Sequence, residues 1–478
     1  MLRARSVALT APHALVTAAA FAVLALATPR AASAQTLDLP GAGMPSTVGR
    51  AGAGVVSADD GAALWLNPAG LARRSAWRAQ LGFTWVARSA SFQTSEAFSF
   101  APAEARQVAA PRVVPALALQ GQLGQRIVFG IAWLEPTELE FAWPTPDPDT
   151  LDAAVEQKDR ARFPARYAAG DLTLRRRGGA AGVSVRALPW LALGASAWLL
   201  RVDASQSRAL WGAQGPINSM PNLSTAFDLR FAASGQAWTP GGAVGALIAP
   251  LDAPVELALS LSFAADATLT GTPTLSDSRG RSDGGERYIT ATVADDASVS
   301  LSLPAPVVAR AGVRFFGERL SLEVGGAVAR GGAATPSWRV RGVGMTFAGA
   351  GSGSVDDVPV GVSVRDGLSV GTAFDADVVP GFLTLSAGWS YARGAVARTA
   401  LSPALPVLDS HTFSLGATAR VEGYTIVMGV SYAPGDAVDL DPGASTVVAP
   451  LAQGAPPAAR GRLEASTTMV GLAVETEL

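Results

Sequence analysis

The sequence predicts an all-β protein, namely a transmembrane antiparallel β-barrel of about fourteen strands that follows a compact N-terminal segment. Two observations predict this fold class. Apolar and polar residues alternate in short runs from residue 77 onwards, and the connections between these runs are short and long in turn. A third observation, an export signal at the N-terminus, places the barrel outside the cytoplasm.

Composition favours one large sheet over several ordinary domains. The chain has 478 residues, of which 51 are glycine and none is cysteine, and its 16% of charged residues give a formal net charge of −2. Barrels routinely exceed the usual length of a domain. A nucleic-acid partner is not expected, because a nearly neutral chain lacks the positive field that phosphates require. The lack of thiols fits export to an oxidising compartment.

Residues 1–34 have the organisation of a secretory signal peptide. Arg3 and Arg5 precede an apolar run at residues 14–27, and Ala32-Ser33-Ala34 forms a small-x-small cleavage site. A retained anchor is the alternative, although the run is short for a spanning helix. No later segment offers the ~20 uninterrupted apolar residues of such a helix, so a chain that enters a membrane has to do so as a closed barrel.

A glycine-rich stretch at residues 49–72 lies between the signal peptide and the strands. Asp59-Asp60 stands where a helix can begin, and Asn67-Pro68 ends that helix, because proline has no backbone N–H and restricts the residue before it. We therefore divide the chain into the signal peptide, a compact segment at residues 35–76 and a barrel at residues 77–478.

The first run after residue 76 shows the alternation most clearly. Trp77, Leu81, Phe83 and Trp85 alternate with polar or small residues, so one face is apolar and ends in an aromatic residue on both sides. Trp77 and Trp85 stand about 26 Å apart along a strand, or roughly 20 Å in height after a ~40° tilt, close to the ~25 Å apolar band of an outer-membrane barrel. Alternation also fits a soluble β-sandwich, in which the apolar face would be the core.

The connections favour the barrel. Tight turns alternate with long polar connections, as in outer-membrane barrels. Counting the runs under this rule gives strands at about residues 77–92, 112–121, 125–136, 166–187, 190–206, 239–249, 255–271, 287–315, 319–331, 356–374, 381–395, 409–421, 423–435 and 460–478. Pro304 and Pro306 interrupt the eighth strand and predict a bulge, an edge or a kink. The alternating residues 338–347 fall in a long connection and are interpreted as a strand extension above the membrane.

The N-terminal stretch resembles a known family. Gly49-Arg50, Ala58-Asp59-Asp60 and above all Asn67-Pro68-Ala69-Gly70-Leu71-Ala72 stand after a signal peptide and before a barrel-like chain. In that position they are similar to the start of the outer-membrane long-chain fatty-acid and hydrocarbon transporters of the FadL/TodX type. Motif-level similarity is confined to residues 49–72, and similarity of the predicted fold covers most of the mature chain.

The resemblance implies a bacterial outer-membrane barrel whose lumen holds an N-terminal hatch, here residues 35–76, with Asn67, Pro68, Ala69 and Gly70 as its motif. It implies passive transport of hydrophobic small molecules, either long-chain fatty acids or hydrocarbons. Such a molecule would be captured by outer loops and released laterally, through a gap in the barrel wall near a kinked third strand. The alternative function is that of a structural or adhesion barrel without transport.

The resemblance also bears on partners. The expected partners are the hydrophobic ligand, outer-membrane lipid and the barrel assembly machinery, and the expected state is a monomer. The chain ends in Glu477-Leu478, where many such barrels end in an aromatic residue, and this departure concerns the usual assembly signal.

Two long connections, residues 137–165 and 207–238, are more apolar than outer loops usually are. Their large apolar side chains are candidates for ligand capture, or else they pack the loops together and seal the mouth of the barrel. They are Phe141, Trp143, Phe163, Trp211, Met220 and Phe227. A further group of inward-facing charges, formed by Glu256, Glu323, Arg314 and Arg420, either holds the hatch by ion pairs or lines the lumen.

Residues for enzymatic chemistry are scarce. We expect no catalytic residue, no metal and no cofactor, and the protein is not expected to be an enzyme. His411 follows Asp409 and Ser410, but neighbouring strand residues point to opposite faces and cannot assemble a triad. The acidic connections around Asp147 and Asp439 lack the spacing of a calcium-binding loop.

Overall fold

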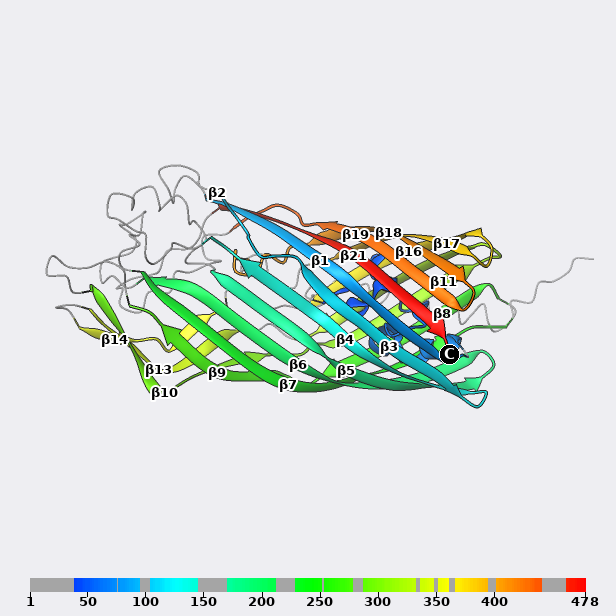
Figure 1. The fold of residues 1–478 in the computed structure, drawn as a ribbon, viewed down its shortest axis with the longest axis horizontal. Helices are drawn as coiled ribbons and strands as arrows, with labels where there is room; N and C mark the ends of the chain where they lie inside the picture. The colour runs from blue at the N-terminus through cyan, green and yellow to red at the C-terminus, as the bar shows by residue number, and fades with distance from the viewer. Residues whose placement is uncertain are drawn as a thin grey trace, which may run out of the picture.

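The computed structural model describes most of the mature chain and is shown in Figure 1. The described residues are 38–74, 76–94, 104–144, 170–211, 228–251, 253–277, 287–331, 336–347, 351–360, 366–393, 401–440 and 461–478. The signal peptide predicted at residues 1–34 lies outside them. In Figure 1 the strands run obliquely around one long axis, and short helices, drawn in blue, lie among them in the right half of the view.

Fourteen antiparallel strands form a closed ring, as the sequence predicts. The ring closes where β21 (Gly461–Glu477) pairs with β1 (Arg78–Thr94) along the full length of both. The other twelve strands, in order around the ring from β1 to β21, are β3 (Arg112–Leu123), β4 (Ile127–Ala142), β5 (Asp171–Leu188), β6 (Leu191–Trp211), β7 (Asp228–Ile248), β8 (Val255–Ala264), β11 (Val307–Phe316), β12 (Leu320–Arg330), β16 (Gly367–Val379), β17 (Leu383–Ala392), β18 (Ser410–Val421) and β19 (Tyr424–Pro434).

The two ends of the ring differ in their connections. At the end that we call the turn end, β5 and β6 are joined by Pro189 and Trp190 alone, whereas at the opposite loop end residues 143–170 separate β4 from β5. Two short strands, β2 (Glu104–Arg106) and β20 (Val438–Asp439), pair with β1 and β21 near the loop end. This alternation of short and long connections is the one that the sequence predicts for an outer-membrane barrel.

Beyond the loop end the sheet continues on one side of the barrel, at the left of Figure 1. This extension consists of β9 (Ala267–Leu275), β10 (Ile289–Leu303), β13 (Ser337–Phe347), β14 (Ser352–Ser354) and β15 (Asp357–Pro359). Residues 337–347 therefore form a strand above the ring, paired with β10, which confirms the interpretation from sequence. Pro304 and Pro306 lie in the break between β10 and β11, as predicted, because proline cannot donate to the ladder.

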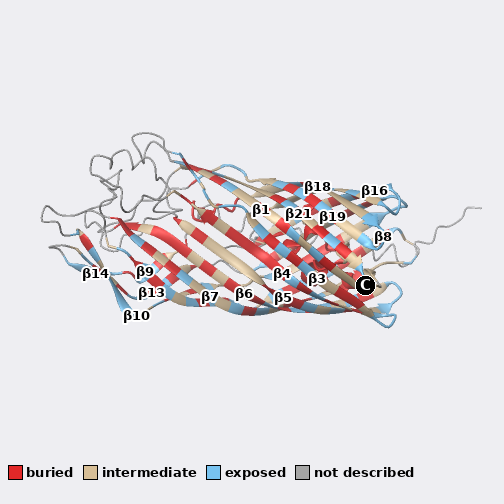
Figure 2. Cartoon of the chain, viewed as in Figure 1, coloured by how far each residue is buried: buried red, intermediate tan, exposed pale blue. Residues whose placement is uncertain are grey.

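Figure 2 shows buried and exposed positions alternating along the strands. The exposed positions of the ring carry many large apolar side chains, and the buried ones between them are often small or polar. On β8, Leu259 and Leu261 are 50% and 43% exposed, whereas Ser260 and Ser262 between them are buried. A soluble sandwich would bury the leucines and expose the serines. Alternation alone fits both a soluble β-sandwich and a membrane barrel. The exposed leucines favour the barrel, whose outer face contacts lipid.

Aromatic residues border the apolar band at both ends. Trp77, Trp190 and Tyr424 are exposed near the turn end, and Trp238 and Tyr432 are exposed towards the loop end. Aromatic girdles at the two interfaces are typical of outer-membrane barrels. Among the described residues, no helix is long and apolar enough to span a membrane.

The N-terminal segment, residues 38–74, contains four short helices: η2 (Pro40–Gly43), α2 (Pro45–Val48), α3 (Ala63–Leu66) and η3 (Pro68–Arg73). Helix α2 lies beside β18, β19, β21 and β1, and η3 lies beside β4, β5, β6 and β7 on the other side of the ring. The segment is thus surrounded by the strands. As predicted, Asn67-Pro68 ends a helix, but that helix begins at Ala63, beyond Asp59-Asp60.

Several strands run past the apolar band towards the loop end, which corrects part of the sequence analysis. Phe141 lies in β4 and Trp211 in β6, whereas both were expected in loops. The alternation that marks a membrane-facing strand is lost above the lipid, so the sequence pattern ends before the strand does. In the other direction, β16 begins at Gly367, later than the predicted residue 356.

Candidate functional site

Asn67 ties the N-terminal segment to the barrel wall. Its side chain is fully buried, and the Nδ2 amide donates to the Val55 carbonyl at 3.1 Å and to the Ala246 carbonyl of β7 at 3.2 Å. Its Oδ1 atom accepts a hydrogen bond from the Ala69 N–H at 3.2 Å. A Cβ atom at Gly245 would lie 2.0 Å from that oxygen, so only glycine admits the amide there. Asparagine suits this position because its short side chain carries both a hydrogen-bond donor and a hydrogen-bond acceptor.

The remaining residues of the predicted hatch motif pack tightly around Asn67. Pro68 occupies the start of η3, where its missing N–H costs nothing and its fixed φ suits the helix. Ala69 is fully buried. A Cβ atom at Gly70 would lie 2.1 Å from the Ala58 carbonyl oxygen. The backbone at residues 58 and 70 can approach this closely only because residue 70 has no side chain.

Arg50 makes the central ion pairs between the segment and the wall. Its Nη1 atom lies 2.6 Å from both carboxylate oxygens of Asp375 on β16, and its Nη2 atom lies 3.0 Å from Oε2 of Glu323 on β12. The other Glu323 oxygen accepts from the Val56 N–H at 2.9 Å. Burial disfavours the charged guanidinium, but the two carboxylates outweigh burial and hold the pKa of Arg50 above its usual value.

A second ion pair joins Arg73 of η3 to Glu256 of β8. Arg314 of β11 lies 3.6 Å from Glu256 and 3.9 Å from Asp375, and so links the two pairs. Of the inward charges that the sequence singled out, Glu323 and Glu256 thus bind the segment. Arg420 instead donates to a threonine hydroxyl on the neighbouring strand at 3.0 Å.

The acidic pair Asp59-Asp60 faces the wall on another side of the segment. The Asp60 carboxylate accepts from the Ser46 hydroxyl at 2.7 Å, from the Ala62 N–H at 2.9 Å and from the Gln80 amide at 3.1 Å. Burial nevertheless raises the pKa of Asp60, and the neighbouring Asp59 raises it further. Asp59 itself forms an ion pair with an arginine at the end of the segment.

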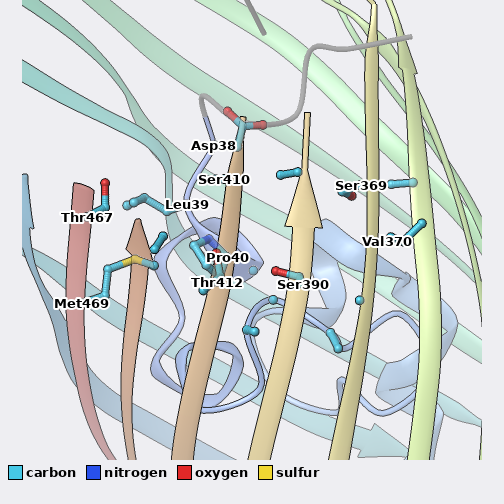
Figure 3. Close-up of a pocket in the computed structure, with 18 of the residues that line it drawn as sticks. Asp38, Leu39, Pro40, Ser369, Val370, Ser390, Ser410, Thr412, Thr467 and Met469 are labelled. Atoms are coloured by element: carbon cyan, nitrogen blue, oxygen red, sulfur yellow. The ribbon is translucent and has the colours of Figure 1, made fainter. Parts of the chain in front are cut away.

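A cavity of about 230 Å³ lies between the N-terminal segment and the loop end, and we call it the outer cavity. Figure 3 shows Asp38, Leu39 and Pro40 of the segment facing side chains from neighbouring strands. Its lining combines apolar side chains, hydroxyl groups and charged side chains. They are Leu39, Phe141, Leu408 and Met469, then Ser390 and Thr412, and finally Asp38, Arg88, Arg310 and Glu323. Such a lining suits a small molecule that has both apolar and polar parts.

A second cavity of about 450 Å³, the inner cavity, lies between the segment and the turn end. It is lined mainly by polar and charged groups, among them Arg50, Arg73, Asp59 and Glu256. Neither cavity is a wide, water-filled channel of the kind that porins enclose.

The wall itself is interrupted between β3 and β4. Their ladder runs from Leu123 opposite Ile127 to Leu117 opposite Trp133 and stops there, although β3 continues to Arg112. On the other side of β4, two residues, Glu135 and Pro136, face the single Arg177 of β5. This bulge bends β4 away from β3. β4 is the third strand of the ring, the strand in which the resemblance implies a kink.

A cavity of about 300 Å³ occupies this interruption, which we call the wall gap. Its lining combines Val113, Pro115, Leu117 and Trp133 with the charged Arg112, Glu135, Glu138 and Arg177. Val113 is 64% exposed and Leu117 44% exposed on the outward face. The gap therefore opens towards the side of the barrel that contacts lipid.

The N-terminal segment covers the wall gap from inside. The Leu39 N–H donates to the Pro136 carbonyl at 2.5 Å, and the Thr137 hydroxyl lies 2.6 Å from a carboxylate oxygen of Asp38. Where backbone pairing is missing, Arg112 reaches across from β3 to Glu138 of β4 at 3.3 Å. The gap is thus closed by side chains and by the start of the segment.

Three of the six residues predicted to capture ligand are described by the structure, and three are not. Phe141 and Trp143 are buried in a large apolar cluster at the loop end, and Trp211 is also buried. Phe163, Met220 and Phe227 lie outside the described residues. The three described side chains do not form an exposed apolar surface, and their role in capture stays a prediction.

The groups weighed for other chemistry are dispersed. His411 of β18 packs on the rings of Trp389 and Tyr391, with centroids 5.9 and 5.0 Å away. Among the residues that the structure describes, no cluster of three histidine, cysteine or acidic side chains could hold a metal. Asp439 pairs with β21 through β20, and Asp147 lies outside the described residues.

Residue patterns alone did not predict the wall gap, which only the resemblance implied, although a signal for it was present in the sequence. Pro136 was taken as the end of a predicted strand, whereas β4 continues to Ala142. A proline inside a strand marks a bulge or an edge, and the same rule had identified the break at Pro304 and Pro306. The inward position of residues 401–408, described below, left no comparable signal in the sequence.

A closed barrel with an apolar outer band and a segment inside its lumen defines an outer-membrane barrel protein. The family model for "Outer membrane protein transport protein (OMPP1/FadL/TodX)" matches residues 23–326, which is more than half of the chain. The chain belongs to this family, whose members are outer-membrane transport proteins and not enzymes, and it resides in the outer membrane. Among curated protein sequences, none is significantly similar to it.

Solved structures with the same fold are distant in sequence. A FadL homologue of Pseudomonas aeruginosa is 18% identical with a TM-score of 0.69, and the alignment covers 91% of this chain and 98% of that one. The toluene transporter TodX of P. putida is 15% identical with a TM-score of 0.60, at 90% and 99% coverage. The toluene transporter TbuX of Ralstonia pickettii is 15% identical with a TM-score of 0.59, at 91% and 98% coverage.

Proposed function

We propose that this protein transports hydrophobic small molecules, long-chain fatty acids or hydrocarbons, passively across the outer membrane and releases them laterally into the bilayer. The observation that carries the proposal is the wall gap between β3 and β4, which opens towards lipid and is covered from inside by the N-terminal segment. Membership of the transport family and the similarity in fold to toluene transporters support it.

The driving force is the hydrophobic effect. Loops at the loop end, which faces the outside in this proposal, capture the molecule, and the outer cavity receives it. An apolar molecule that leaves through the gap gains about 25 cal/mol for each Å² that it buries in hydrocarbon. A water-filled passage would offer no such gain. The segment at residues 35–76 acts as a hatch, because it fills the lumen on the straight route to the turn end.

The remaining expectations belong to the same proposal. The protein is a monomer that contacts outer-membrane lipid, uses no cofactor and catalyses no reaction. Residues 1–34 are removed as a signal peptide, and the barrel assembly machinery inserts the mature chain. Asn67, Pro68, Ala69 and Gly70 hold the hatch to the wall. The apolar side chains named from the sequence, Phe141 among them, either serve ligand capture or pack the loops together and seal the mouth of the barrel.

Deletion of Pro136 tests lateral release. The deletion leaves Glu135 alone opposite Arg177, so β4 regains an unbroken ladder with β5 and can pair with β3 above Leu117. We expect the variant to fold, and to lose accelerated uptake of a fluorescent long-chain fatty acid and of toluene by reconstituted vesicles. Unchanged uptake by a well-folded deletion variant would refute lateral release.

The control is Glu135→Gln, which keeps the bulge and removes one charge from the gap. It should transport both probes at close to the wild-type rate, because the proposal assigns release to the shape of the wall. If the wild type does not accelerate uptake of either probe over empty vesicles, the transport function itself is wrong.

A further inference from the structure

Residues 401–408, which are part of the connection between β17 and β18 at the loop end, fold into the barrel. The exposed fraction is 3% for Leu401, 0% for Ala404, 3% for Leu405 and 5% for Leu408. These side chains belong to the same apolar cluster as Phe141 and Trp143. A connection on the loop end of such a barrel usually lies in water, so the burial of this one needs a reason. We call residues 401–408 the inner strap.

Local hydrogen bonds fold the inner strap into a compact turn. The Leu405 N–H donates to the Ser402 carbonyl at 3.3 Å, and the Val407 N–H donates to the Leu405 carbonyl at 2.8 Å. The Ser402 hydroxyl accepts from the Ala404 N–H at 3.2 Å. Because these bonds lie within the strap, it can move as a unit without losing them.

Trp143 connects the inner strap to the opposite part of the wall. Its indole Nε1–H donates to the Pro403 carbonyl at 2.9 Å, and the ring is buried. Trp143 directly follows β4, the strand that carries the wall gap, whereas the strap follows β17. This hydrogen bond joins segments 260 residues apart in the sequence.

The inner strap borders the outer cavity. Pro406, Val407 and Leu408 line the cavity, together with Ser410 and Thr412 of the strand that follows. The cavity is also lined by Leu39 and Pro40 of the N-terminal segment. The strap therefore lies between the cavity and the loop end, where a molecule from outside arrives.

We propose that the inner strap is a gate on the outer cavity and that Trp143 is the residue that positions it closed. This rests on the proposed transport function. A hydrophobic molecule enters by taking the place of Leu401, Leu405 and Leu408 in the apolar cluster. The exchange of one apolar surface for another leaves the buried apolar area nearly constant, so the hydrogen bond from Trp143 decides how easily the strap moves. Trp143 thus acts on the strap and need not touch the molecule.

Cysteine labelling tests the gate without requiring transport. The wild-type chain has no cysteine, so a single Ala404→Cys substitution places one reactive thiol in the strap. We would measure its reaction with a water-soluble maleimide in the purified, folded protein, using Thr290→Cys on the exposed face of β10 as the freely accessible reference. Ala404→Cys should react much more slowly than the reference, and equal rates would overturn the closed strap.

The second arm adds Trp143→Phe, which keeps an aromatic ring in the cluster and removes the N–H donor. Labelling of Ala404→Cys should become about fivefold faster, the factor expected for one lost hydrogen bond. An unchanged rate in a folded variant would overturn the role of Trp143. Should Trp143→Phe fail to fold, toluene added to the single Ala404→Cys variant gives the answer. Faster labelling supports the gate, and slower or unchanged labelling contradicts it.

Uptake by vesicles separates this proposal from the transport function. Trp143→Phe should raise the initial rate of uptake of the fluorescent fatty acid while leaving the final extent unchanged. A labelling result as expected, combined with no uptake by the wild type, would uphold the moving strap and refute transport. Normal uptake by the wild type, combined with rapid labelling of the single Ala404→Cys variant, would uphold transport and refute the gate.

Discussion

Glu323 of β12 and Arg50 of the N-terminal segment form an ion pair at 3.0 Å where the two lumen cavities meet. Glu323 lines the outer cavity and Arg50 lines the inner cavity, and the backbone at Ala53 and Gly54 borders both. The partition between the two cavities therefore includes one buried ion pair and one turn of chain. An apolar molecule in the outer cavity meets charge in this direction.

Removal of Arg50 should destabilise the protein strongly. Arg50→Ala leaves Glu323 and Asp375 without their arginine, and breaking a buried ion pair typically costs about 3–5 kcal/mol. We expect a large drop in the urea concentration at which the reconstituted barrel unfolds. Arg106→Ala is the control, since Arg106 pairs with Glu104 on the exposed surface and should change little. Similar small effects of both substitutions would show that Arg50 does not hold the segment.

The fit between Asn67 and Gly245 gives a second prediction. Gly245→Ala would bring a methyl group 2.0 Å from Oδ1 of Asn67, so the amide would have to leave the carbonyl of Ala246. We expect a loss of stability of about 1–3 kcal/mol and faster proteolysis of the N-terminal segment. Gly179→Ala makes the same change on β5 with no atom within 4 Å and should be close to neutral. Equal behaviour of the two variants would contradict this packing.

The sequence allowed the ring to be predicted because both of its signals are local. Alternation with a period of two identifies a membrane-facing strand, and turn residues separate one strand from the next. Pro304 and Pro306 were informative for the same reason, since a missing N–H interrupts a ladder wherever the partner strand lies. The block around Asn67 added the N-terminal segment through resemblance.

Features made by contacts between distant residues could not be predicted. Phe141 and Trp143 read as parts of an outer loop, because no local pattern tells that a strand continues above the lipid or that a ring turns inward. The ion pairs of Arg50 depend on which inward positions of β12 and β16 face the segment. That choice follows from register and from the path of the segment through the lumen, neither of which has a local signal.

The buried carboxyl of Asp60 should make stability depend on pH. Because burial raises the pKa of Asp60, the folded protein binds this proton more readily than the unfolded chain, in which aspartate titrates near about pH 4. The stability that the Asp60 carboxyl contributes is thus complete below about pH 4. It is lost as the pH rises through the raised pKa that Asp60 has in the folded protein. Asp60→Asn should flatten the fall in stability across this range, as measured by urea unfolding between about pH 4 and about pH 8.

The asparagine can be accommodated at this position. Oε1 of Gln80 has no hydrogen-bond partner among the described residues, so a rotated Gln80 amide can accept from the new side chain. Asp59→Asn is the comparison. It removes an ion pair with Arg74 and should lower stability, and because Asp59 raises the pKa of Asp60, it should reduce the slope with pH without abolishing it. An unchanged slope in Asp60→Asn would assign the pH dependence to another group.

The outward leucines give the most direct test of the membrane band. Leu259 is 50% exposed near the middle of β8, and in water an arginine at such a position would be harmless. In lipid the same charge has to leave the hydrocarbon, which costs about 2–4 kcal/mol at the centre of a bilayer. Leu259→Arg should therefore destabilise the folded protein in vesicles by about that amount. Thr270→Arg on β9, which lies in the extension beyond the ring, should have little effect because water surrounds it. If Leu259→Arg were as well tolerated as Thr270→Arg, the apolar face of β8 would not contact lipid, and the argument from exposed leucines would fail.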